Sequence, residues 1–270
     1  MKRALSLLLF LCIQLTCAQK PQLPNLRLEG VRIWVDDLSA AKRFYTEILG
    51  FEADSRGTDP MSILIHTGST PIYLSKAKLS SKAIYGQHIR TGLTLQVPKL
   101  LPAIDQLREA GIRVEETQLQ RNGVGISIPF RDASGNLLSL MEVQIRPVAP
   151  FTGFKVYNSG ITTSDMEKAI AFYEHKLGFK EWSGDYLPAA LPLKHSDNSF
   201  AFMLHEKPGL ERLELRYGVD SNLNLVFSIS DLSLVKNHLN TLGIKVHPSI
   251  SSDGLVFEDP FGNHCEVIRK

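Results

Sequence analysis

The stretch "FYTEILGF" at Phe44–Phe51 returns later in the chain as "FYEHKLGF" at Phe172–Phe179. In the first copy, Ala41, Phe44, Tyr45 and Ile48 recur three and four positions apart, which is the spacing of one helix face. The glycine before the last phenylalanine of each octet ends the helix, because glycine adopts the left-handed backbone conformation without a steric cost. Each octet therefore predicts the end of a helix that packs through one apolar face.

Other segments repeat in the same order. "LLPAIDQLREAGIRV" (Leu100–Val114) corresponds to "LSLVKNHLNTLGIKV" (Leu232–Val246), and "DASGN" (Asp132–Asn136) corresponds to "DPFGN" (Asp259–Asn263). A repeat of about 130 residues is too long for a solenoid and has the size of a duplicated domain. Between the helices, apolar and polar residues alternate with a period of two, which predicts strands. Each half therefore contains a strand, a helix and three strands, and then the same series again.

The alternation also predicts which face of each strand a side chain occupies. Val31, Ile33 and Val35 would face the helices, and so would the apolar residues of the later strands, such as Leu93 and Leu225. The opposite face is mostly polar, which favours a solvated concave surface over a dry closed barrel. Its residues would be Gly30, Arg32, Trp34, Gly92, Thr94, Gln96, Asn222, Asn224, Val226 and Ser228.

The N-terminus has the pattern of a secretory signal. Lys2 and Arg3 precede a short apolar run, and small residues lead to Ala18, after which we expect cleavage. The protein would then be secreted or periplasmic, with no membrane span; an uncleaved anchor or a lipoprotein acylated at Cys17 are the alternatives. The formal net charge of +2 comes from Lys2 and Arg3, so the remaining chain is neutral and nothing in it favours nucleic acid as a partner.

The proline-containing segment "VQIRPVAPFTG" is the natural linker between the two repeats. We therefore expect a signal peptide at 1–18, a loose leader at 19–26, a first domain at 27–145, a linker at 146–153 and a second domain at 154–270.

These motifs resemble the vicinal oxygen chelate superfamily, which includes glyoxalase I, extradiol dioxygenases, and fosfomycin- and bleomycin-resistance proteins. The resemblance rests on "VDDLSAAKRFYTEILGF" with "DASGN", and on "TSDMEKAIAFYEHKLGF" with "DPFGN". It implies an α+β fold of two tandem domains. Each domain would consist of paired βαβββ modules that form a curved, cup-like mixed sheet, with helices outside and the ligand inside.

The resemblance also indicates where metal-dependent members carry their ligands, namely on the first, fifth and last strands of a domain. In the first half these positions hold Gly30, Gly92 and Ser139, which cannot bind a metal usefully. In the second half they hold two carboxamides and a carboxylate, which fall short of the usual transition-metal set. We expect no metal in the first domain, whereas Fe, Mn, Ni or Zn stays open for the second. The candidate residues there are Asn158, Asn224, Glu266, His264 and His205.

Without a metal, Glu266 and His264 could form an acid–base pair, because residues two apart on a strand share a face. Alternatively, Glu266 could hydrogen-bond Asn158 and Asn224 across one floor of the cup. Arg32 could bind a carboxylate or phosphate, or simply lie in solvent. The remaining candidates for ligand binding are Thr162 and Trp34, where Trp34 either stacks on a ligand or fills the cup.

Three functions are compatible with this sequence. The first is an exported protein that binds a small molecule in a polar cup without transforming it. The second is a lyase, isomerase or dioxygenase that uses a divalent metal in the second domain. The third is an interaction module whose cups are vestigial, and both a monomer and a homodimer are compatible with all three.

Overall fold

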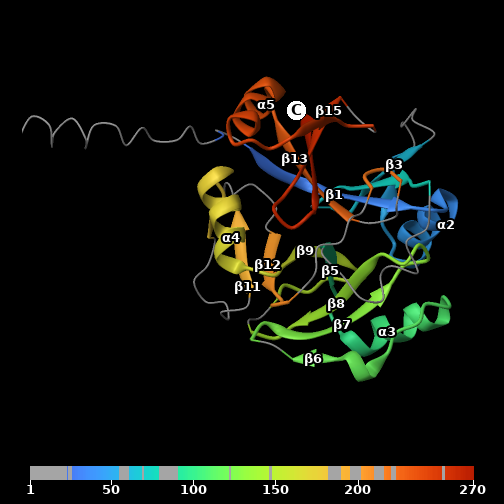
Figure 1. The fold of residues 1–270 in the computed structure, drawn as a ribbon. Helices are drawn as coiled ribbons and strands as arrows, with labels where there is room; N and C mark the ends of the chain where they lie inside the picture. The colour runs from blue at the N-terminus through green and yellow to red at the C-terminus, as the bar shows by residue number, and fades with distance from the viewer. Residues whose placement is uncertain are drawn as a thin grey trace, which may run out of the picture.

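The structure is a computed structural model, and the residues that it describes form a succession of four βαβββ modules (Figure 1). It describes residue 23 and residues 26–54, 61–68, 70–78, 91–121, 123–145, 148–181, 190–194, 202–209, 216–219, 223–250 and 253–270.

The first two modules belong to the first sequence repeat. Module 1 contains β1 (Arg27–Val35), α2 (Leu38–Arg43), the π-helical turn η1 (Phe44–Ile48), β2 (Glu52–Ala53), β3 (Ser62–His66) and β4 (Ile72–Lys76). Module 2 contains β5 (Thr91–Gln96), α3 (Leu100–Glu109), the short 3-10 turn η2 (Glu116–Gln118), β6 (Gln120–Arg121), β7 (Gly125–Arg131) and β8 (Leu137–Val143).

The last two modules belong to the second repeat. Module 3 contains β9 (Lys155–Thr163), α4 (Met166–Ile170), the π-helical turn η3 (Ala171–Lys176), β10 (Lys180–Glu181), β11 (Ala190–Lys194) and β12 (Phe202–Glu206). Module 4 contains β13 (Leu223–Ile229), α5 (Leu232–Thr241), β14 (Val246–Pro248), β15 (Gly254–Glu258) and β16 (His264–Arg269).

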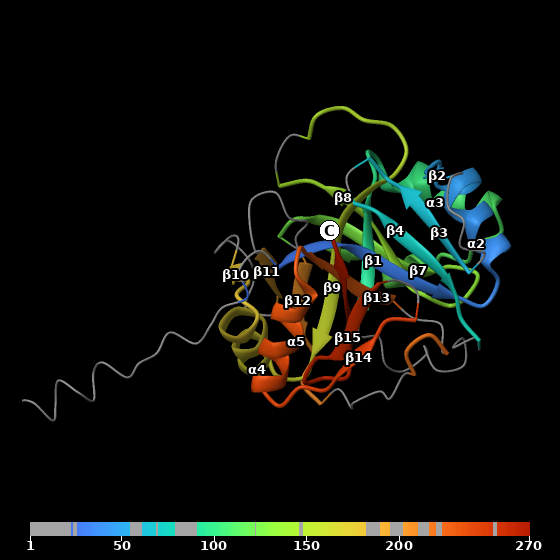
Figure 2. The ribbon, with the colours of Figure 1, turned by 90° about the horizontal axis from the view of Figure 1, so that it is seen from above.

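The strands form two eight-stranded mixed sheets, and each sheet takes one module from each repeat. Sheet 1 has the order β14-β15-β16-β13-β1-β4-β3-β2 and joins modules 1 and 4, with β1 antiparallel to β13. Sheet 2 has the order β10-β11-β12-β9-β5-β8-β7-β6 and joins modules 2 and 3, with β5 antiparallel to β9. Figures 1 and 2 show the helices at the periphery of the molecule, outside both sheets. The expected α+β fold of paired βαβββ modules is confirmed.

The repeated octet ends its helix with a widened turn. In the first copy, the backbone N–H of Leu49 donates to the carbonyl of Phe44, and that of Phe51 donates to the carbonyl of Tyr45. Both bonds span more residues than the four of an α-helix. Gly50 follows with a φ of 75°, which is the left-handed conformation expected of it. The second copy repeats the arrangement, including the bond from Leu177 to Phe172.

The hydrophobic core lies on the helix side of the sheets, as the strand alternation predicts. Val31, Ile33 and Val35 are fully buried there, and their neighbours Arg32 and Trp34 point to the opposite, inner face. Leu23 and Leu26 also belong to this core, although the sequence pattern assigns them to a loose leader. Leu23 and Leu26 therefore attach this part of the chain to the fold.

Aromatic contacts join modules that follow one another in sequence but belong to different sheets. The ring centres of Phe44 in module 1 and Phe130 in module 2 are 6.4 Å apart. Those of Phe172 in module 3 and Phe257 in module 4 are 6.3 Å apart. The two sheets are thus held together through the helix-side core of each repeat. Among the described residues, none of the helices combines the length and the apolar character that a bilayer crossing requires.

Candidate functional site

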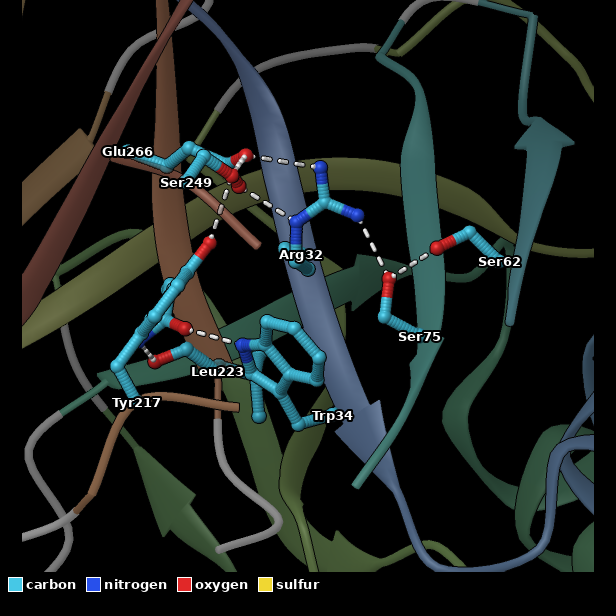
Figure 3. A network of polar contacts seen from close by, with 9 residues as sticks. Arg32, Trp34, Ser62, Ser75, Tyr217, Leu223, Ser249 and Glu266 are labelled. Atoms are coloured by element: carbon cyan, nitrogen blue, oxygen red, sulfur yellow. Dashed lines mark hydrogen bonds and ion pairs between the residues drawn. The ribbon is translucent and has the colours of Figure 1, made fainter. Parts of the chain in front are cut away.

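The inner face of sheet 1 carries a buried carboxylate that pairs with an arginine (Figure 3). Glu266 lies on β16 and is 0% exposed, and Arg32 lies on β1 and is 2% exposed. The guanidinium Nε donates to Oε2 of Glu266 at 2.5 Å, and Nη2 donates to Oε1 at 3.1 Å. This is the bidentate geometry in which an arginine and a carboxylate bind most strongly.

Hydroxyl groups extend this ion pair in both directions. On one side, Nη1 of Arg32 donates to Ser75 Oγ at 2.6 Å, and Ser75 Oγ lies 2.8 Å from Ser62 Oγ. On the other side, Ser249 Oγ donates to Oε1 of Glu266 at 2.7 Å and lies 3.1 Å from the hydroxyl of Tyr217. The network spans the sheet from β3 to the loop before β15.

Aromatic rings enclose the ion pair. The guanidinium carbon of Arg32 lies 5.1 Å from the ring centre of Tyr73 and 5.8 Å from that of Trp34. Trp34 donates its indole N–H to Asn224 Oδ1 at 2.6 Å and makes an edge contact with Tyr217. Burial, followed by the nearby charge of Glu29, raises the pKa of Tyr73 to about 12, so this phenol stays neutral at physiological pH.

His264 shares the inner face of β16 with Glu266, as the alternation predicts. Its Nε2 lies 3.4 Å from Oε1 of Glu258, and its ring lies 5.6 Å from the ring of Tyr217. The side chain is only 6% exposed. An acid–base pair of His264 with Glu266 stays a prediction. Glu266 accepts hydrogen bonds from Arg32 and Ser249.

The donor set around Glu266 does not fit a divalent metal. Both carboxylate oxygens accept hydrogen bonds from a guanidinium, and a positive charge already compensates the carboxylate. Among the described residues, no three histidine, cysteine, aspartate or glutamate side chains come together in a metal-binding group. We therefore derive no reaction step through a metal at Glu266.

Backbone packing explains why position 30 cannot carry a metal ligand. A Cβ atom on Gly30 would lie 2.3 Å from the carbonyl oxygen of Pro71, a distance that real Cβ contacts do not reach. Glycine at this position is thus required by the close approach of two backbones.

The inner face of sheet 2 has a different character. Thr94 on β5, Ser139 on β8, and Asn158 and Thr162 on β9 alternate with buried core residues and are half-buried. His205 on β12 is exposed and pairs with Thr162 in the register of the two strands. Solvent therefore reaches a surface made of hydroxyl, carboxamide and imidazole groups.

His205 lies across a glycine of the neighbouring strand. A Cβ atom on Gly160 would lie 3.0 Å from both Cδ2 and Nε2 of the imidazole. Although His205 is exposed, the protein atoms around its ring partly desolvate it and lower the pKa of His205 below its ordinary value, which favours the neutral form at pH 7. Among the described strand positions that face inward in sheet 2, none is a carboxylate, so this face bears no negative charge there.

Two expectations about the site are wrong. Asn158 does not share a floor with Asn224 and Glu266, because β9 belongs to sheet 2 whereas β13 and β16 belong to sheet 1. His205 cannot join Glu266 and His264 at a metal for the same reason. The physical reason is that the structure pairs modules across the repeats, and not the two modules within one repeat.

Of the other candidates, Arg32, Trp34, Asn224 and Glu266 do come together, whereas Asn158, Thr162 and His205 share the inner face of sheet 2, where only Thr162 and His205 are direct strand partners. The sequence patterns did not single out five contributors to the first group, namely Ser62, Tyr73, Ser75, Tyr217 and Ser249. Tyr73 and Ser75 could have been found, because they alternate with the apolar residues of "PIYLS". Ser249 and Tyr217 lie outside the strands, where no periodicity indicates their direction. Asn222 lies outside the described residues.

Comparison with known proteins identifies the family. A sequence model of the Glyoxalase/Bleomycin resistance protein/Dioxygenase superfamily matches residues 27–140 and again residues 154–267. The chain belongs to this superfamily and contains its domain twice.

An individual relative resembles this chain at low sequence identity. An iron-dependent extradiol dioxygenase from Rhodococcus jostii (strain RHA1) is 27% identical over 195 residues, which represent 65% of this chain and 62% of that protein. The chain thus matches less than two thirds of the length of this relative.

Solved structures confirm the fold. Glyoxalase I from Zea mays matches with a TM-score of 0.64 at 16% identity, over 91% of this chain and 92% of that one. A putative dioxygenase from Bacillus subtilis subsp. subtilis str. 168 matches with a TM-score of 0.61 at 13% identity, over 89% and 84% of the two chains. At such identities these likenesses show the fold alone.

Proposed function

We propose that this protein binds a small polar molecule on the inner face of sheet 2. The observation that carries the proposal is the contrast between the two inner faces. In sheet 1, Arg32, Ser75, Asn224 and Glu266 are buried and hydrogen-bonded within the face, with Arg32 and Glu266 at 2% and 0% exposure. In sheet 2, Thr94, Ser139, Asn158 and Thr162 are half-buried, and His205 is exposed and borders Gly160.

The chemistry of the second face defines the class of ligand. Thr94, Ser139 and Thr162 offer hydroxyl groups, Asn158 offers a carboxamide, and His205 offers a largely neutral imidazole. Such a face suits a neutral or anionic molecule with several hydrogen-bonding groups, because it lacks a described carboxylate that would attract a cation. Membership of a superfamily that includes bleomycin-resistance proteins supports binding as the role of this face.

The metal-dependent lyase, isomerase or dioxygenase is less well supported as a function. The Rhodococcus relative is named as an iron-dependent dioxygenase. In this chain, however, Glu266 is bound by an arginine, and His205 lies on the other sheet. The proposed function therefore does not include the iron chemistry of that relative.

A thermal-shift screen against a library of polar metabolites tests the binding proposal. A ligand stabilises the native state by mass action, so a compound at 100 times its Kd adds about 2.7 kcal/mol to the free energy of unfolding. We expect at least one compound to raise the Tm of the wild type. The shift should be lost in Asn158→Ala and His205→Ala, and retained in His66→Ala, which removes a surface histidine from β3.

Two results would contradict this assignment. One is a screen in which no compound stabilises the wild type, which would favour an interaction module with vestigial inner faces. The other is a compound that stabilises the wild type and both inner-face variants equally, because that compound would bind elsewhere.

We also propose that the chain is exported and cleaved after Ala18. Burial of Leu23 and Leu26 in the core supports this position, since a later cut would remove side chains that the fold uses. Intact-mass measurement of the exported protein should give a chain that begins at Gln19. A mass that includes residues 1–18, or a lipid on Cys17, would show that this proposal is wrong.

A further inference from the structure

Three kinds of group surround the guanidinium of Arg32. A carboxylate binds it on one edge, with Nε and Nη2 donating to the two oxygens of Glu266. A hydroxyl binds it on another edge, where Nη1 donates to Ser75 Oγ. The faces of Tyr73 and Trp34 border it at 5.1 and 5.8 Å. Carboxylates in bidentate geometry and aromatic faces are groups to which guanidinium cations bind well.

Glu266, in turn, requires a positive charge beside its carboxylate. The carboxylate is 0% exposed, so without a cation it would be a buried and uncompensated charge. Ser249 also donates to Oε1 of Glu266, and its hydroxyl is neutral. Arg32, a residue 234 positions away on another strand of the same sheet, supplies a positive charge directly to this carboxylate.

We propose that the side chain of Arg32 permanently occupies the cation-binding position beside Glu266 on the inner face of sheet 1. It makes the contacts there that a guanidinium ligand from solution would make. Its guanidinium takes the positions at Glu266 that a divalent metal would need, and it closes this face to metals. The site is consequently selective for a flat, bidentate cation, and its primary role is to bind module 1 to module 4. The proposal concerns sheet 1 alone and does not depend on a ligand at sheet 2.

Chemical rescue of an arginine-truncated variant tests the proposal. Arg32→Ala removes the cation and leaves the carboxylate buried, so we expect the Tm to fall by about 10 °C. Methylguanidinium chloride at 10 mM should then restore several degrees, because it can occupy the vacated position. Sodium chloride at the same concentration should restore nothing, since a general salt effect does not supply the bidentate geometry.

Matched variants separate this effect from general stabilisation. Arg43→Ala, which removes an exposed arginine from α2, should keep the wild-type Tm and show no response to methylguanidinium. Arg32→Ala combined with Glu266→Gln should recover part of the lost stability but lose the response to methylguanidinium. A response that persists in the double variant would overturn the proposal, because the compound would then bind elsewhere.

Metal analysis provides a test that needs no folded variant of Arg32. The wild type, dialysed against Mn²⁺, Ni²⁺, Zn²⁺ or Fe²⁺, should retain no metal that depends on Glu266. Stoichiometric metal that is lost in Glu266→Gln would overturn the proposal. So would an Arg32→Ala variant that is as stable as the wild type. If Arg32→Ala does not fold, Arg32→Lys should fold with a lower Tm, because lysine keeps the charge but loses one of the two parallel bonds.

Discussion

Asp132 and Asp259 begin the two repeated turns "DASGN" and "DPFGN", and each carboxylate is buried. Oδ1 of Asp132 accepts the backbone N–H groups of Ser134 and Asn136, both at 2.9 Å, and Oδ2 accepts the side-chain amide of Asn136 at 3.1 Å. Asp259 makes the same bonds within its own turn. The aspartate therefore shapes the turn because it satisfies backbone donors that would otherwise be buried without partners.

Burial makes the Asp132 turn sensitive to pH. Loss of solvation raises the pKa of Asp132 from 3.8 to about 6, and the hydrogen bonds from Asn136 and Ser134 oppose this shift without cancelling it. The folded protein thus holds the proton more tightly than the unfolded chain does. The corresponding stabilisation is complete below about pH 4 and is lost as the pH rises through 6.

We predict that the wild type loses stability relative to Asp132→Asn as the pH rises from 4 to 7. The relative change should reach about 3 kcal/mol, because about two pKa units separate the folded and unfolded states. Urea unfolding of both proteins at several pH values measures the difference, in which the other titrating groups cancel. Parallel stability curves for the two proteins across this range would contradict the prediction.

At the scale of elements, the widened helix ends place two tyrosines in the core. Tyr45 and Tyr173 lie at equivalent positions of η1 and η3, and both are fully buried. The hydroxyl of Tyr173 donates to Oδ2 of Asp259 at 2.8 Å, which joins a helix of module 3 to a turn of module 4. The hydroxyl of Tyr45 makes no hydrogen bond among the described residues. Both copies of the repeat thus contain this tyrosine, but among the described residues only Tyr173 forms a hydrogen bond through its hydroxyl.

We predict that Tyr173→Phe destabilises the protein, whereas Tyr45→Phe does not. The first change removes a buried donor from a carboxylate and should cost about 2 kcal/mol, with a fall in Tm of roughly 4–8 °C. The second removes a hydroxyl whose burial is not compensated, so its effect on the free energy of unfolding should be near zero or favourable. Thermal unfolding of the two variants makes this comparison, and equal losses in both would show that the observed bond has no energetic weight.

At the scale of the whole molecule, the sequence predicts the modules but not their partners. Alternation in β1 correctly separates Val31 and Ile33 on the core side from Arg32 and Trp34 on the inner side, since side-chain direction is a local property of a strand. Which strand lies beside β1 is not local. The two repeats have the same motifs, so no pattern in either one distinguishes pairing within a repeat from pairing across repeats.

The consequence for the candidate site follows directly. Arg32 and Glu266 are 234 positions apart and meet only because β1 and β16 both lie beside β13. Pairing within the second repeat would instead have placed Asn158 beside Asn224. The identities of the polar side chains were therefore predictable, whereas their partners depended on the arrangement of the modules.

This arrangement predicts that neither repeat is complete alone. Residues 19–147 contain β1 and β5, whose antiparallel partners β13 and β9 lie in the other repeat. Each repeat expressed separately would expose two strand edges and the unpaired half of the Arg32–Glu266 ion pair. Exposed edges of this kind pair with other chains. We therefore expect each repeat alone to aggregate or to form dimers through these edges.

Co-expression of residues 19–147 with residues 148–270 should restore a soluble one-to-one complex, because both sheets can then form. Size-exclusion chromatography with light scattering gives the mass of each species. Glu266→Ala in the second fragment should weaken the complex, since it leaves Arg32 buried without a counter-charge. Asp253→Ala provides the control, because its contact with Arg269 lies at the surface and within the same fragment. A folded monomer of either repeat alone would contradict the pairing of modules across the two halves of the chain.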